Sequence, residues 1–73
     1  MENKYSSEIQ FISKKIKLLR EEKNMTQQAL ASFCDIDVRT IQRIETGHYN
    51  MTLNVFFAIA EALEISTSEL IKI

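Results

Sequence analysis

Apolar residues recur at three- and four-residue intervals along most of the chain, the spacing that gathers side chains on one face of a helix. The first such stretch, residues 7–23, is predicted to be a helix with an inner face of Ile9, Ile12, Ile16 and Leu19. Asn24 follows it, and Asn tolerates the left-handed conformation with which helices often end. The pattern therefore predicts one long amphipathic helix at the start of the chain.

Two shorter helices are predicted at residues 27–33 and 38–46. Thr26 precedes the first and Asp37 the second, and both residue types accept hydrogen bonds from the free N–H groups at a helix start. The apolar side chains expected to face inward are Leu30, Phe33, Ile41 and Ile44.

Residues 34–36 form a tight turn between these two helices. Asp35 stands where the chain must reverse, and Asp accepts unusual backbone angles better than most residues. Gly47 closes the second short helix. The segment from about residue 26 to 46 is therefore predicted to be a helix-turn-helix.

The helix that follows Thr52, to about residue 63, is apolar on nearly every side. Its expected inner stripe is Leu53, Phe56, Ala60 and Leu63, and a second stripe is Val55, Ala58, Ile59 and Ala62. Ser66 and Glu69 form a capping box for a last helix through Ile71. A helix that is hydrophobic all round is usually buried, and one small domain is not expected to cover both stripes.

We therefore predict a two-fold dimer through residues 53–73, with Ile73 adding apolar surface nearby. The predicted interface consists of Val55, Phe57, Ala58, Ile59, Ala62, Ile65 and Ile71. The alternative is a slightly oversized core with Phe57 left exposed. Phe11 and Leu18 form a further apolar line that either packs with Tyr5 or extends the interface.

Composition supports an all-α fold, a compact five-helix bundle that forms one domain over residues 1–73. The chain has no proline and one glycine, which argues against β-hairpins. A domain of this size buries only about 60% of its unfolded surface, so association with a partner is plausible on energetic grounds.

The sequence offers no chemistry typical of an enzyme. One His and one Cys cannot form a zinc site, and no nucleophile–base arrangement can be identified. We expect no cofactor, metal or small-molecule ligand, and we interpret Cys34 as a small core residue rather than a redox switch. The first ten residues lack an apolar run of signal-peptide length and no segment has the length of a membrane span, so a cytoplasmic protein is expected.

Charge is unevenly distributed. Residues 1–43 carry eight Lys or Arg against six Asp or Glu, whereas residues 44–73 carry one Lys against four Glu. The net charge is −1, although nucleic-acid-binding domains are usually basic. The first half of the chain is thus the better candidate to face phosphates.

Residues 12–70 resemble the Cro/repressor type of helix-turn-helix domain, the XRE family of bacterial and phage regulators. The positions that carry the resemblance are Ile16, Leu19, Arg20, Thr26, Gln27, Leu30, Ala31, Ile36, Ile41, Ile44, Glu45, Gly47, Thr52, Leu53, Phe56, Ile59, Ala60, Leu63, Ile65 and Leu70. The chain departs from the family pattern at Asp35 and Glu64, where glycine is common, and it has no proline near Met51.

The resemblance implies that the helix at residues 38–46 lies in the major groove of double-stranded DNA. The residues implied in base contacts are Val38, Arg39, Thr40, Gln42 and Arg43. Arg can donate two hydrogen bonds to guanine, Gln can pair with adenine, and Val38 can contact a thymine methyl group. The alternative is a polar helix face that only meets solvent.

The resemblance also implies phosphate contacts and one structural ion pair. Gln27 begins a helix, where backbone N–H groups favour anions, and Thr26 caps that helix. The loop that usually touches the DNA backbone is here His48, Tyr49 and Asn50, for which a solvated loop is an equal alternative. Arg20 and Glu45 match a family pair that forms a partly buried salt bridge.

Together these observations predict a sequence-specific DNA-binding transcription regulator that acts as a homodimer on a palindromic operator. Small single-domain members of the family include restriction-modification controller proteins, phage repressors and antitoxins, and the sequence leaves the choice among them open. The contrasting hypothesis, motivated by a pI near 5.8, is a protein-interaction module that keeps the fold with weak or no DNA binding.

Overall fold

A computed structural model describes residues 4–72 of the chain, so Ile73 lies outside the described residues. Within this range the secondary structure is entirely helical. The helices are α1 (Ser6–Glu22), α2 (Gln27–Cys34), α3 (Val38–Glu45), α4 (Leu53–Ala62) and α5 (Thr67–Ile71). The predicted all-α, five-helix architecture is confirmed, with helix ends within about one residue of those expected. None of these helices is both long enough and apolar enough to cross a membrane.

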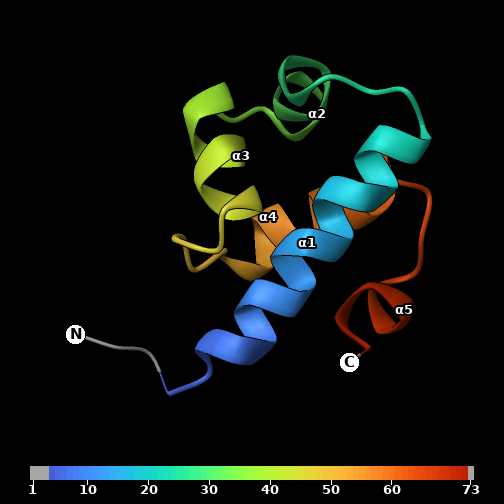
Figure 1. Ribbon diagram of the computed structural model, residues 1–73. Helices are drawn as coiled ribbons and strands as arrows, with labels where there is room; N and C mark the ends of the chain where they lie inside the picture. The colour runs from blue at the N-terminus through green and yellow to red at the C-terminus, as the bar shows by residue number, and fades with distance from the viewer. Residues whose placement is uncertain (1–3, 73) are drawn as a thin grey trace.

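The long helix α1 crosses the molecule, with α2 and α3 on one side of it and α5 on the other (Figure 1). α2 packs against both α3 and α4, and α5 packs against α1 and α4. The core lies between these helices and is formed by Ile16, Leu30, Ala31, Ile41, Ile44, Phe56, Ile59, Ala60, Ala62, Leu63 and Leu70.

Four helices begin with the expected side-chain caps. Thr26, Thr52 and Ser66 each accept a hydrogen bond from the backbone N–H three residues later, and Asp37 accepts one from the N–H of Arg39. Each cap satisfies one N–H that has no partner within its helix. The helix starts are therefore determined locally by the sequence.

Residues with a left-handed backbone lie just after three helices, at the positions where the sequence predicted that the helices end. Asn24 and Asp35 have φ of 55° and 57°, and Gly47 has φ of 81°. Glu64, the second position where the family commonly has glycine, also has positive φ, at 56°. The chain thus keeps the backbone geometry of the family pattern without the glycines.

Two residues expected to face inward are exposed. Phe33 is 54% exposed because the inner face of α2 is centred on Leu30 and Ala31, and Phe33 falls to its side. Leu53 is 71% exposed, since it begins α4 at the edge of the molecule. Phe11 and Leu18 are also exposed, on α1.

The buried face of α4 is rotated relative to the prediction, toward Ile59. Ile59 is fully buried and Ala62 is 7% exposed within a single chain, so these two residues of the predicted dimer interface belong to the core and offer little surface to a partner. The physical reason is that α4 packs against both α2 and α5, which together cover more of its surface than expected. Leu53 and Phe57 remain on the uncovered edge.

Candidate nucleic-acid interface

Helix α3 separates its buried and exposed side chains sharply. Ile41 and Ile44 are fully buried and attach the helix to the core. Arg39, Gln42 and Arg43 are exposed along the outer face, and Val38 and Thr40 are half-buried beside them. The structure therefore places three of the five predicted base-contacting side chains together on an open surface, with the other two at its margin.

The turn before α3 sets the direction in which that surface points. Asp35 donates its backbone N–H to the carbonyl of Ser32 at 3.2 Å, and Ile36 donates to the carbonyl of Ala31 at 3.0 Å. These bonds close the end of α2 while Asp35 adopts the left-handed conformation. Asp in place of glycine thus preserves the tight reversal between the two helices.

A buried ion pair fixes α3 against α1, and the expected pairing of Arg20 with Glu45 is present. Arg20 Nε donates to Glu45 Oε2 at 2.7 Å, and Arg20 Nη2 donates to Glu45 Oε1 at 3.1 Å. Arg20 Nη1 donates to the carbonyl of Met25 at 2.6 Å. The hydrogen bonds to Glu45 raise the pKa of Arg20 above its ordinary value, so the guanidinium stays charged despite its burial.

Gln27 joins this network, which sequence reasoning did not foresee. Its side-chain Nε2 donates to Glu45 Oε1 at 3.0 Å, so the start of α2 is tied to the end of α3. The same amide nitrogen carries a second hydrogen, which remains available to an anion at the N-terminus of α2. Thr26 is exposed, and its hydroxyl oxygen accepts from the N–H of Ala29 at 3.0 Å.

The loop after α3 folds back on the helix. His48 donates its backbone N–H to the carbonyl of Arg43 at 3.0 Å, and Thr46 Oγ1 donates to the same carbonyl at 3.0 Å. The Arg43 guanidinium lies over the Tyr49 ring, 5.5 Å from its centroid. His48 and Asn50 are exposed, and Tyr49 is half-buried. The contact between Arg43 and Tyr49 carried no distinct sequence signal, because the two residues lie on either side of a helix end.

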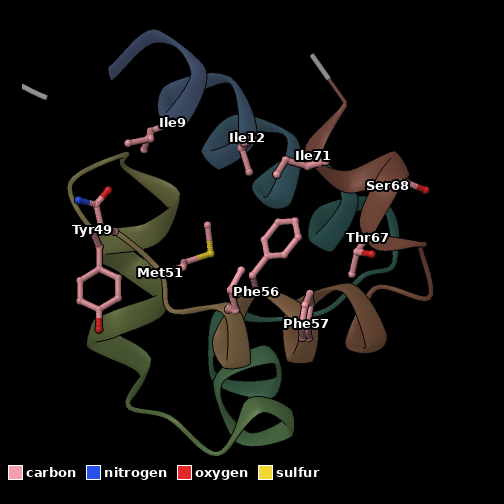
Figure 2. A pocket seen from close by; sticks show the side chains of 11 residues that line it. Ile9, Ile12, Tyr49, Met51, Phe56, Phe57, Thr67, Ser68 and Ile71 are labelled. Carbon is pink, nitrogen blue, oxygen red and sulfur yellow. The ribbon is translucent and has the colours of Figure 1, made fainter. Parts of the chain in front are cut away.

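An apolar groove of about 400 Å³ opens beside this loop, between α1, α4 and α5. Figure 2 shows Met51 and Phe56 pointing into it, with Phe57 and Ile71 at its sides. Phe57 and Ile71 are 52% and 54% exposed, whereas the other predicted interface residues with accessible surface are half-buried: Val55, Ala58 and Ile65. Phe11 and Leu18 do not line this groove.

Comparison with known proteins places this geometry in a family. The model of the helix-turn-helix family HTH_3 matches residues 16–70. No curated protein matches the chain. The restriction-modification controller protein C.AhdI from Aeromonas hydrophila has a similar structure, with a TM-score of 0.82 and 27% identity over 90% of this chain and 98% of its own.

The wild-type restriction-modification controller protein C.Esp1396I is also similar, with a TM-score of 0.73 and 33% identity over 96% of this chain and 90% of its own. The matched region contains the α2–α3 motif, the Arg20–Glu45 pair and the caps described above. The chain therefore belongs to the XRE-type helix-turn-helix family of DNA-binding transcription regulators.

Proposed function

We propose that the protein binds a palindromic DNA operator as a homodimer and that α3 of each protomer enters the major groove. The observation that carries this proposal is the outer face of α3, where Arg39, Gln42 and Arg43 are exposed on a helix whose opposite face is buried in the core. A helix fixed in this way presents its side chains at a constant angle to DNA.

The three exposed side chains have the chemistry of base readout. An Arg side chain donates two parallel hydrogen bonds to O6 and N7 of guanine, and a Gln side chain pairs with N6 and N7 of adenine. Each such pair contributes about 1–3 kcal/mol of discrimination against a wrong base. Val38 and Thr40 stand at the margin of the face, where Val38 is suited to a thymine methyl group.

Phosphate contacts are assigned to the start of α2 and to the loop after α3. Gln27 offers its backbone N–H and the second hydrogen of its side-chain amide, and Thr26 offers its hydroxyl hydrogen. His48, Tyr49 and Asn50 add hydrogen-bond donors from the loop. Because few of these groups are cationic, each protomer releases few counterions, and the salt dependence of binding is expected to be moderate.

The dimer forms through the apolar groove and the uncovered edge of α4. Leu53, Phe57 and Ile71 are each more than half exposed around that groove, which is a large apolar surface for so small a domain. A two-fold partner that covers it places two recognition helices about 34 Å apart, one turn of DNA. Val55, Ala58 and Ile65 lie partly accessible and complete the surface.

The similar solved structures support a narrower role, the control of a restriction-modification system. Both C.AhdI and C.Esp1396I are restriction-modification controller proteins, and the resemblance extends over at least nine-tenths of this chain in each case. This role predicts that a methyltransferase gene and a nuclease gene lie beside the gene for this protein. Neighbouring genes of another kind, such as a toxin gene, would instead indicate a different regulator.

DNA binding is tested by selection from a randomised palindromic duplex library, followed by a salt titration of binding to the enriched sequence. The wild-type protein should enrich one sequence, and the double variant Arg39→Ala, Arg43→Ala should lose that preference while it remains folded. Failure of the wild-type protein to bind with any salt sensitivity would favour the interaction-module hypothesis.

The dimer is tested by sedimentation at micromolar concentration. The wild-type protein should sediment at twice the 8.5 kDa chain mass, and Phe57→Glu should sediment as a monomer. Phe33→Glu is the matched control, because Phe33 is exposed to nearly the same extent but lies on α2, away from the groove. A wild-type protein that sediments only as an 8.5 kDa species would exclude the dimer.

A further inference from the structure

Arg39 and Arg43 share one face of α3, but their surroundings differ. The Arg43 guanidinium lies 5.5 Å from the centroid of the Tyr49 ring, a distance within the range of a cation–π contact. Within residues 4–72, no hydrogen bond, ion pair or ring contact holds the Arg39 side chain. One of the two arginines is therefore restrained before any DNA arrives, and the other is not.

Tyr49 is itself held firmly. It is half-buried and packs against the hydrophobic core, and it lines one end of the apolar groove. In Figure 2 its ring extends from the groove along α3. The backbone immediately before it is bonded to α3, because His48 donates to the carbonyl of Arg43 itself. These contacts hold the ring beside the end of α3 that carries Arg43.

We propose that Tyr49 is a positioning residue that orients Arg43 for base readout, and this inference rests on the proposed function of α3. An arginine loses rotamer freedom when it binds a base, and a restraint that already exists in the free protein reduces that loss. The contact with the ring face is an electrostatic attraction between the positive charge of the guanidinium and the π electrons of the ring, and it needs no N–H donor. Its in-plane N–H groups, none of which bonds to another group of residues 4–72, remain available to a base.

The contact is tested first in the free protein by NMR. The ring current of Tyr49 should shift the side-chain protons of Arg43 upfield, and Tyr49→Leu, which keeps apolar packing, should remove that shift. Tyr49→Phe should preserve it, and the Arg39 protons serve as the internal control. Arg43 protons that do not respond to Tyr49→Leu would overturn the inference whether or not the protein binds DNA.

The functional consequence is tested on the operator enriched by the wild-type protein and on single-base-pair variants of it. The base pair read by Arg43 is identified as the one whose replacement no longer matters in Arg43→Ala. Tyr49→Leu should reduce discrimination at that base pair by about two- to fivefold, the effect of an exposed cation–π contact. Discrimination at the base pair read by Arg39 should not change.

Tyr49→Phe separates positioning from a direct phosphate contact through the hydroxyl group. Positioning requires that Phe restore discrimination to the wild-type level. A uniform loss of affinity in Tyr49→Phe, with Tyr49→Leu no worse, would overturn the inference, and so would tighter binding by Tyr49→Leu. If the wild-type protein enriches no sequence while the NMR shift is present, the proposed function fails rather than the contact.

Discussion

Replacement of Glu45 by Ala should be severely destabilising, because it removes the buried counter-charge of a buried guanidinium. The Glu45 side chain is 2% exposed and the Arg20 side chain is 10% exposed, so little solvent reaches either group. The substitution removes the two hydrogen bonds from Arg20 and the one from Gln27, and it leaves Arg20 with the carbonyl of Met25 and a solvent-exposed carboxylate of Glu21 at 3.9 Å. Breaking a buried pair in this way costs about 3–5 kcal/mol.

That loss is large relative to the total stability of so small a domain. Globular proteins gain roughly 0.05–0.15 kcal/mol per residue, which gives about 4–11 kcal/mol for 73 residues. A domain of this size loses about 4–8 °C of melting temperature per kcal/mol. The Glu45→Ala variant should therefore melt at least about 12 °C below the wild-type protein and be partly unfolded near room temperature.

The measurement is urea and thermal unfolding followed by circular dichroism at 222 nm, since the chain has no tryptophan to report by fluorescence. Glu45→Gln keeps the hydrogen-bonding shape without the charge and should lie between Ala and wild type. The double variant Arg20→Met, Glu45→Leu removes both charges and should recover much of the loss, because apolar residues often replace a buried pair with little change in stability.

Lys23 and Glu64 supply the exposed control. They form a 2.5 Å ion pair, and the hydrogen bond from Lys23 lowers the pKa of Glu64, but the Glu64 side chain is 78% exposed. Glu64→Gln should leave the unfolding midpoint almost unchanged. A Glu45→Ala protein that is within about 1 kcal/mol of wild type would refute the reasoning that burial determines the cost.

Three further predictions concern other positions. Gly47→Ala should lose about 1–2 kcal/mol of stability, because a left-handed φ of 81° strains any residue with a Cβ, and the added atom would lie 2.9 Å from the Gln10 side chain; unfolding curves equal to wild type would contradict this. Asp35→Gly should be at least as stable as wild type, and Asp35→Ala should be about 1 kcal/mol less stable than Asp35→Gly, as measured by urea unfolding. Burial raises the pKa of the Cys34 thiol above its ordinary value of 9.0, so iodoacetamide should alkylate it at pH 8 more slowly in the native protein than in urea, and an equal rate would count against burial.

Much of the fold could be predicted from local patterns. The caps at Thr26, Asp37, Thr52 and Ser66 place the starts of four helices, because each satisfies a backbone N–H within three residues of itself. The apolar spacing in α3 likewise determines which side of that helix is exposed. The arginines and the glutamine on its outer face could therefore be identified before the structure was known.

The assignment of the α4 surface could not be predicted in the same way. Nearly every side of that helix is apolar, so periodicity does not distinguish a buried face from an exposed one. Packing against α2 and α5 makes this choice, and it buries Ile59 while it leaves Leu53 exposed. The predicted core stripe of α4 was correspondingly displaced around the helix.

The sequence by itself determined the helices, their boundaries and the polar face of α3, because these depend on hydrogen bonds and spacings within a few residues. Only the tertiary structure decided which side chains meet across the boundaries of these helices. It adds Gln27 to the buried Arg20–Glu45 pair and places the Tyr49 ring over Arg43. The contact of Gln27 depends on the angle at which α2 and α3 meet, which results from the packing of the core rather than from any local pattern. The contact of Tyr49 depends on the path of the loop after α3, which no helical spacing determines.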